Sequence, residues 1–174
     1  MTPEKGPSIA VVGAGLVGSL LALVLANRGH SVTVYERRSD PRKVGDAAGR
    51  SINLALSERG WRALEIAGAL EAVRQIAMPV KARCMHNQAG VLTYQPYGLP
   101  GRGRFGDDEC IFSVARGPLN RILLEEAEAT GLVQVQFDHA LQDFSETDDQ
   151  VTLHFRDGQT IGHSRVFGTD GAFS

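Results

Sequence analysis

The clearest chemical signal in the sequence is a group of glycines close to its start. Residues 13–18, Gly-Ala-Gly-Leu-Val-Gly, fit the pattern G-x-G-x-x-G, and Glu36 stands 18 residues beyond the last of these glycines. In such a pattern Gly13 permits a tight turn from strand to helix, Gly15 lets a pyrophosphate approach the backbone, and Gly18 lets the helix pack closely on the sheet. The N–H groups at the start of that helix carry a partial positive charge and bind phosphate. We therefore predict a site for the ADP half of a dinucleotide.

Glu36 indicates which dinucleotide the site accepts. Its carboxylate can accept hydrogen bonds from both ribose hydroxyls of an adenosine, and it repels a 2′-phosphate, so NADP is disfavoured at this site. The sequence finishes on residues 169–174, Thr-Asp-Gly-Ala-Phe-Ser. NAD-dependent dehydrogenases rarely combine such an Asp-Gly pattern with a first βαβ unit. FAD is therefore the predicted dinucleotide, and NAD is the alternative.

The segments around the glycines supply the context that the motif needs. Residues 8–12 form a short apolar run that predicts a strand, and residues 19–28 are rich in Leu and Ala and predict a helix that ends at Gly29. Residues 31–35 are β-branched and aromatic, which predicts a second strand directly before Glu36. A glycine motif between a strand and a helix, with an acidic residue after the next strand, is typical of a dinucleotide-binding βαβ unit.

Similar patterns predict the remaining elements. We expect a polar loop over residues 37–50 and a loop rich in glycine and arginine over residues 96–108. The later helices are predicted over residues 58–67, over 70–77, and from 116–118 up to Gly131. The later strands are predicted over residues 51–56, 80–86, 91–95, 111–114, 133–137, 140–145, 151–156 and 165–168. Asp157-Gly158 is typical of a hairpin turn.

These elements predict an α/β fold. We expect a Rossmann-like FAD-binding fold with a parallel sheet, into which the antiparallel strands at the start of a substrate domain are inserted. Residues 8–78 and 111–174 are assigned to FAD binding and residues 79–110 to the substrate-binding strands. The sequence stops on the residues of a tight turn, so we interpret residues 1–174 as the incomplete, N-terminal part of an FAD-binding domain.

Composition argues against several other classes of protein. Apolar residues make up 43% and charged residues 22%, as in soluble globular proteins, and a net charge of −2 offers no basic surface for nucleic acid. Cys84 and Cys110 have neither CxxC spacing nor clustered histidines, so we expect reduced thiols and no metal site. No stretch resembles a signal peptide or reaches the roughly 18 apolar residues of a membrane span, which makes the cytoplasm the expected location. The sequence carries no signal for an oligomeric state.

Three stretches together resemble one enzyme family. Residues 13–18 with Glu36, and residues 165–174, are similar to the corresponding motifs of flavin-dependent aromatic hydroxylases in general. Residues 49–60, Gly-Arg-Ser-Ile-Asn-Leu-Ala-Leu-Ser-Glu-Arg-Gly, resemble kynurenine 3-monooxygenases more specifically. The shorter stretches 95–98, Gln-Pro-Tyr-Gly, and 113–116, Ser-Val-Ala-Arg, resemble the same family.

The resemblance implies an FAD-dependent monooxygenase that uses NADPH and O₂ to hydroxylate L-kynurenine at ring position 3. Arg83 and Tyr97 match the pair that holds the substrate carboxylate, and an arginine can bind a carboxylate through two hydrogen bonds. Asp170 matches an aspartate near the flavin. The other residues that the resemblance assigns to FAD binding are Val17, Glu36, Arg37, Arg38, Ala55, Arg116 and Leu141. No residue stands out as an acid–base catalyst.

Two further interpretations stay open. The chain is a non-catalytic FAD- or dinucleotide-binding module if the family's later Gly-Asp motif, which lies beyond Ser174, is needed to complete the site. It is another flavoprotein hydroxylase or reductase if the resemblance over residues 50–56 is accidental. Without the resemblance, Arg83 is interpreted as a strand-surface arginine and Tyr97 as a packed loop aromatic.

Overall fold

The computed structural model describes residues 8–44 and 52–172. The chain divides into two compact units, which we describe one at a time: the first unit comprises Met1–Arg50 and Asn120–Ser174, and the second unit comprises Ser51–Leu119. A parallel sheet in the first unit and antiparallel strands in the second confirm the predicted α/β class. The assignment of residues 79–110 to substrate binding concerns function and stays a prediction.

A four-stranded parallel sheet forms the centre of the first unit. Its strands lie in the order β12 (Arg165–Gly168), β1 (Ile9–Val12), β2 (Val32–Tyr35) and β8 (Val133–Gln136). All three pairings are parallel and in register. The two central strands are short and mostly apolar and are almost entirely buried, as expected for a parallel sheet that is covered on both faces.

Helix α1 (Leu16–Ala26) follows the glycine motif and packs on β1, β2 and β8. It begins earlier than predicted because the last glycine of the motif is already helical, and it ends with Gly29 at a φ of +84°. A second short helix, α2 (Pro41–Val44), lies where we predicted only a polar loop. Its cause is local: Pro41 suits a first helical position, and the Asp40 carboxylate accepts the Arg42 N–H at 3.0 Å, as an N-cap does. The rest of that loop, residues 45–50, lies outside the described residues.

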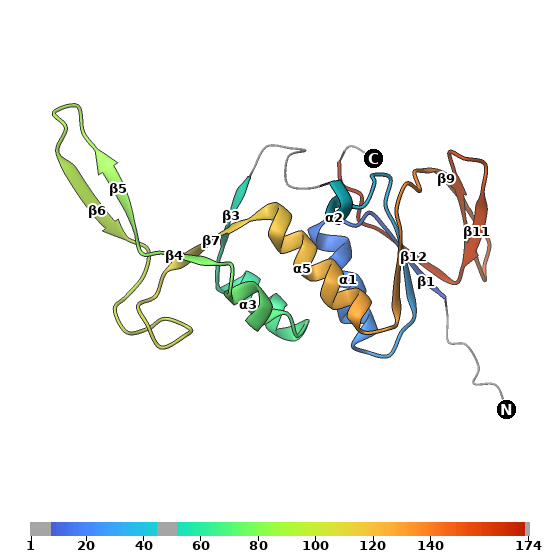
Figure 1. The fold of residues 1–174 in the computed structure, drawn as a ribbon, viewed down its shortest axis with the longest axis horizontal. Helices are drawn as coiled ribbons and strands as arrows, with labels where there is room; N and C mark the ends of the chain where they lie inside the picture. The colour runs from blue at the N-terminus through green and yellow to red at the C-terminus, as the bar shows by residue number, and fades with distance from the viewer. Residues whose placement is uncertain (1–7, 45–51, 173–174) are drawn as a thin grey trace. The chain divides into compact units, whose positions relative to one another are not determined.

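A three-stranded antiparallel sheet covers the face of the parallel sheet opposite α1 (Figure 1). It consists of β9 (Leu141–Glu146), β10 (Val151–Phe155) and β11 (Thr160–His163), with β10 in the centre. The two sheets share an apolar core of Ala10, Val12 and Tyr35 on one side and Leu153 and Phe155 on the other. The predicted turn at Asp157-Gly158 is confirmed, and β11 is the partner strand that the sequence analysis did not name.

The second unit combines a small sheet, two helices and a hairpin. The sheet has the order β3 (Asn53–Leu56), β7 (Ile111–Ala115) and β4 (Met78–Val80), and all its pairings are antiparallel. Helix α3 (Glu58–Ile66) buries Trp61, whose ring makes edge-to-face contacts with Phe105 and Phe112. Helix α4 (Leu70–Arg74) is shorter than predicted because the chain turns into β4 before Pro79. Helix α5 (Arg116–Ala129) begins in this unit and continues into the first.

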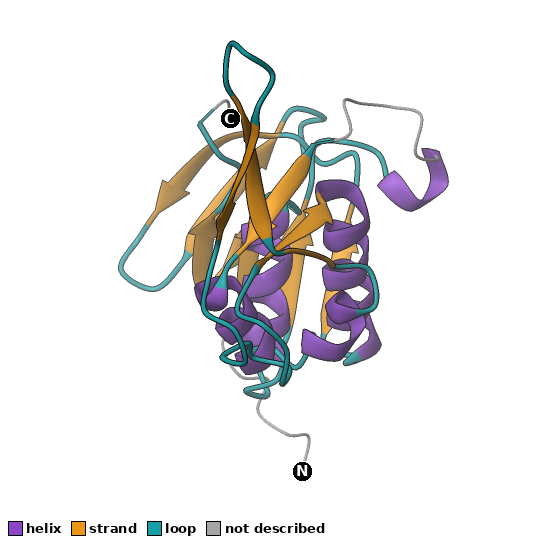
Figure 2. Ribbon diagram, turned by 90° about the vertical axis from the view of Figure 1, so that its left-hand side faces the viewer, coloured by secondary structure: helices purple, strands orange, loops and turns teal. Residues whose placement is uncertain are grey.

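The predicted hairpin is present as β5 (Ala82–His86) and β6 (Leu92–Pro96). It is a two-stranded arm that pairs with no third strand among the described residues (Figures 1 and 2). The predicted strand over residues 80–86 is in fact divided, with its first part belonging to β4 and the rest to β5. The described residues include no helix that is long and apolar enough to cross a membrane.

Candidate dinucleotide-binding site

The carboxyl ends of the parallel strands bring the motif residues together. The last residues of β12, β1 and β2 lie in one row of the sheet, so Thr169, Gly13 and Glu36 each begin a connection at the same edge. The chain passes from β1 to β2 on one side and returns as β12 on the other side of β1. Open α/β sheets bind ligands at such a reversal of strand order, outside the carboxyl ends.

Gly13 and Gly18 are required by the packing of the protein itself. Gly13 has a φ of +97°, and a Cβ atom there would lie 2.7 Å from the Cα of Asp170. A Cβ on Gly18 would overlap the carbonyl oxygen of Gly13 and lie 2.6 Å from Oγ1 of Thr169. The Thr169 hydroxyl donates to the carbonyl oxygens of Val12 at 2.8 Å and of Gly13 at 3.0 Å. Hydrogen bonds from Thr169 therefore join the glycine loop to the Asp-Gly turn.

Gly15 differs from these two glycines because the protein leaves the space beside it open. A Cβ on Gly15 would meet no described atom within 4 Å, and its backbone is extended. Gly15 is the N-cap of α1, which has no side-chain cap hydrogen bond in the described structure and no acidic residue in its first turn. The first N–H groups of a helix have no intrahelical partner and carry positive charge. This open, electropositive helix start fits the phosphates of a dinucleotide.

Glu36 is held in place by backbone and side-chain donors. Its Oε2 accepts the Ala14 N–H at 2.9 Å, and its Oε1 accepts the Arg38 N–H at 2.9 Å and the Arg38 Nε at 2.8 Å. Burial alone would raise the pKa of this carboxyl, but the hydrogen bonds from Arg38 and Ala14 together lower it. Glu36 is thus a fixed carboxylate that can accept hydrogen bonds from ribose, although Arg38 already uses part of its capacity.

The remaining predicted FAD residues of the first unit occupy different positions. Val17 lies in the first turn of α1 with its side chain exposed, and Asp170 is exposed directly after Thr169. Leu141 is half-buried at the start of β9, where it packs against the core between the two sheets. Arg37 is exposed next to Glu36. Contacts of these residues with FAD stay predictions.

Ala55 and Arg116 belong to the β3–β7 strand pair of the second unit and to the helix that follows it. Ala55 in β3 pairs with Ser113 in β7, and Arg116 follows β7 as the first residue of α5. The Arg116 N–H donates to the carbonyl oxygen of Ile52 at 3.0 Å, which continues the ladder between β3 and β7. Both residues are exposed, so either can reach a ligand from this strand pair. Their role in FAD binding stays a prediction.

Arg83 and Tyr97 project from the same face of the hairpin. Arg83 pairs with Gln95, and the Tyr97 N–H donates to the carbonyl oxygen of Lys81 at 3.0 Å, which extends the β5–β6 register by one pair. Residues two apart in a strand share a face, and Tyr97 is therefore the diagonal neighbour of Arg83. Diagonal neighbours are close enough for long side chains to bind one ligand. This geometry is compatible with the predicted carboxylate pair.

Three residues of the site were missed in the sequence. Thr169 fastens the glycine loop, while Ser19 and Asn120 both donate to the carbonyl oxygen of Ala14, at 3.1 Å and 3.0 Å. Ser19 follows the last glycine directly, so a search of the first helical turn for hydroxyl donors could have found it. Asn120 lies 106 residues from Ala14, and no local pattern connects them.

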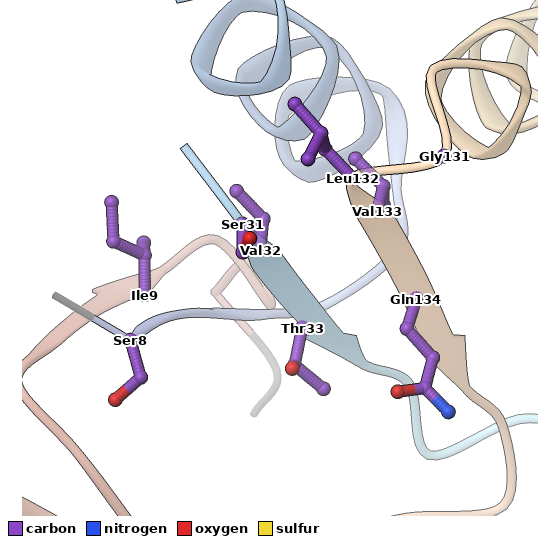
Figure 3. Close-up of a pocket in the computed structure, with 9 residues that line it drawn as sticks. All are labelled: Ser8, Ile9, Ser31, Val32, Thr33, Gly131, Leu132, Val133 and Gln134. Carbon is purple, nitrogen blue, oxygen red and sulfur yellow. The ribbon is translucent and has the colours of Figure 1, made fainter. Parts of the chain in front are cut away.

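Each unit also contains a hollow. One, of about 350 Å³, lies at the opposite, amino ends of β1, β2 and β8. Figure 3 shows Ser8, Thr33 and Gln134 pointing to one face of the sheet there, and Val32 and Val133 to the other. The second hollow, of about 570 Å³, lies in the second unit between α3 and residues 97–112, and Tyr97 is among the residues that line it.

Comparison with known protein families shows the family to which the chain belongs. The family described as FAD binding domain matches residues 7–174. The chain belongs to this family. FAD is therefore its cofactor. The assignment of Gly15 and the start of α1 to the phosphates, and of Glu36 to the ribose, stays a prediction.

Curated relatives narrow the comparison. The chain is 43% identical over 180 residues to the kynurenine 3-monooxygenase of Flavobacterium psychrophilum, covering 98% of this chain. It is 42% identical over 180 residues to the kynurenine 3-monooxygenase of Myxococcus xanthus, covering 100% of this chain. In both cases the match covers 37% of the relative. The chain therefore spans little more than a third of the length of these relatives.

Solved structures of other proteins share the fold of this FAD binding domain. The p-nitrophenol 4-monooxygenase PnpA of Pseudomonas putida superposes with a TM-score of 0.78 over 97% of this chain and 42% of its own, at 23% identity. The structure of FqzB superposes with a TM-score of 0.76 over 98% of this chain and 37% of its own, also at 23% identity. At this level of identity the likeness concerns the fold alone.

Proposed function

We propose that the protein, at its full natural length, is an FAD-dependent monooxygenase that uses NADPH and O₂ to hydroxylate L-kynurenine at ring position 3. The observation that carries the proposal is the arrangement of Gly15 and Glu36 at the carboxyl ends of the parallel strands, in a chain that is 43% identical to a kynurenine 3-monooxygenase over nearly its whole length. The cytoplasm is the proposed location, and cell fractionation with immunoblotting tests it.

In this proposal the first unit holds the cofactor. The N–H groups at the start of α1 bind the pyrophosphate beside Gly15, and the Glu36 carboxylate accepts hydrogen bonds from the adenosine ribose. Asp170, fixed next to the glycine loop through Thr169, lies at the point where the strand order reverses. Arg37, Arg38, Val17 and Leu141 contribute further contacts. When bound, the reduced flavin supplies the activation of O₂, for which protein side chains alone are not suited.

The second unit binds and orients the substrate. The Arg83 guanidinium and the Tyr97 hydroxyl, on one face of the β5–β6 hairpin, hold the amino-acid carboxylate of L-kynurenine. Because both groups bind the part of the substrate that does not react, they orient the aromatic ring and take no part in the bond changes. Ala55 in β3 and Arg116 at the start of α5 contact the cofactor.

The decisive experiment uses the full-length protein reconstituted with FAD. NADPH oxidation is followed with and without L-kynurenine, and the hydroxylated product is identified by mass spectrometry. The proposal predicts that L-kynurenine stimulates oxidation and is converted to its 3-hydroxy derivative. If flavin is retained but L-kynurenine neither stimulates oxidation nor is hydroxylated, the substrate assignment is wrong.

Substitution of the carboxylate pair tests the binding mode. Arg83→Ala removes charge-assisted hydrogen bonds worth about 1.5–3 kcal/mol, so KM for L-kynurenine should rise about 10- to 100-fold. Arg156→Ala, an exposed arginine in the turn after β10, is the matched control and should leave KM unchanged. An unchanged KM for Arg83→Ala would show that this hairpin face does not bind the substrate carboxylate.

A further inference from the structure

The peptide group between Ala14 and Gly15 is held by one side chain from the adjoining helix α1 and one from α5, which is distant in the sequence. The carbonyl oxygen of Ala14 accepts two hydrogen bonds, from the Ser19 hydroxyl at 3.1 Å and from Nδ2 of Asn120 at 3.0 Å. On the other side of the residue, the Ala14 N–H donates to Glu36 at 2.9 Å. Ala14 and Ser19 are both buried, so water does not compete for these bonds.

This carbonyl oxygen is rigidly coupled to the N–H group of Gly15. The two groups belong to one planar trans peptide, in which C=O and N–H point in opposite directions. Donors that fix the carbonyl oxygen therefore also fix the Gly15 N–H, which points the opposite way. The space beside Gly15 itself is open, since a Cβ there would meet no described atom within 4 Å. A phosphate at the helix start is bound by N–H groups of this kind.

Asn120 holds this carbonyl at an energetic cost. Because its Nδ2 must donate to Ala14, the orientation of the amide is determined, and its Oδ1 is left buried without a hydrogen-bond partner among the described residues. An unsatisfied buried acceptor destabilises a fold, whereas an apolar side chain of similar shape avoids the penalty. The side chain is thus poorly explained by stability alone, and a role at the site explains it better.

We infer that Asn120 is a positioning residue of the cofactor site: through the Ala14 carbonyl it orients the Gly15 N–H that binds the pyrophosphate of FAD. The inference rests on the proposed function only in that FAD is the ligand. Asn120 itself is not required to touch the cofactor. Ser19 supports the same carbonyl from within α1, so the two side chains share the task.

The test compares FAD affinity with the stability of the apoprotein in the full-length protein. The Kd for FAD is measured by calorimetric titration of deflavinated protein, and the melting temperature is measured without FAD. Asn120→Leu removes the donor and the unsatisfied acceptor together, so the Kd should rise about fivefold, as for the loss of one hydrogen bond, while the melting temperature stays within a few degrees. Ser19→Ala, which removes the other donor, should also raise the Kd. Glu125→Ala, on an exposed position of α5, is the control.

Asn120→Asp provides a readout that a purely structural role would not change. Its carboxylate cannot donate to Ala14, but the protonated acid has an O–H that can. The Kd for FAD, taken relative to the wild type at each pH, should therefore be raised at pH 8 and recover as the pH is lowered to about 5.5, whereas Asn120→Leu shows no recovery.

The outcomes separate this inference from the proposed function. Asn120→Leu with a Kd within twofold of the wild type overturns the inference. So does a loss of affinity in Asn120→Leu that merely follows a lower melting temperature, with no pH recovery in Asn120→Asp. Failure of the wild-type protein to bind FAD at all would instead refute the proposed function.

Discussion

Replacing Gly15 by alanine should separate cofactor binding from folding. The backbone at Gly15 is extended, and an added Cβ meets no described atom within 4 Å, so the folded protein accepts it. Alanine is a poorer N-cap than glycine by about 0.5 kcal/mol, but it also reduces the entropy of the unfolded chain by a similar amount. The free energy of unfolding without FAD should therefore change by less than about 0.5 kcal/mol.

The affinity for FAD should respond much more strongly. The new methyl group occupies the space through which the pyrophosphate approaches, so at least one charge-assisted hydrogen bond is lost, at about 2 kcal/mol. This corresponds to a Kd that is about 30-fold higher. Gly18→Ala is the matched control, because its Cβ overlaps the Gly13 carbonyl oxygen and should lower the melting temperature of the apoprotein.

The assay combines calorimetric FAD titration with urea denaturation of the apoprotein for both variants. The reasoning is refuted if Gly15→Ala binds FAD with a Kd within twofold of the wild type, because the pyrophosphate then does not pass over Gly15. It is also refuted if Gly15→Ala destabilises the apoprotein as much as Gly18→Ala does, because the space beside Gly15 is then not open.

Two further predictions concern the core and a loop. Burial lowers the pKa of His163, so the unfolded state takes up a proton first and the free energy of unfolding falls as the pH drops below about 6.5. In urea denaturation between about pH 6.5 and 5, His163→Asn should flatten that fall. An equally steep fall in the variant and the wild type would contradict this. The Arg104 guanidinium forms ion pairs with Glu58 at 2.8 Å and with Glu65 at 2.6 Å, but both carboxylates are exposed. Arg104→Ala should therefore lower the free energy of unfolding by at most about 1 kcal/mol and mainly accelerate chymotryptic cleavage of the loop 96–110. Arg102→Ala is the control, and equal cleavage rates for the two variants would refute a role of Arg104 in holding the loop.

Local signals explain which parts of the fold could be predicted. The β1–α1–β2 unit was predictable because strand, glycine turn, helix and acidic residue are contiguous, each with its own preference. Helix α2 was missed because four residues within a polar stretch produce no periodicity, although Asp40 and Pro41 mark its start. The division between β4 and β5 was missed because a continuous strand-like stretch does not show where a strand changes its partner.

The candidate site was predictable only in its local part. Gly13, Gly15, Gly18 and Glu36 follow from spacing along the chain. The reason for two of the glycines does not, because the atoms that exclude a Cβ from Gly13 and Gly18 include those of Thr169 and Asp170. Contacts between segments so far apart arise from strand order, which no single stretch of sequence encodes.

The bond from Thr169 to the glycine loop also determines when the site can form during synthesis. The loop is synthesised well before Thr169, and its carbonyl groups receive the Thr169 hydroxyl only after another 156 residues have been made. At about 5–20 residues per second, that delay lasts on the order of ten to thirty seconds. During this interval the loop lacks the partner that fastens it in the finished domain. A nascent chain should therefore acquire FAD late, after β12 has joined the sheet, and not while the first strands are emerging.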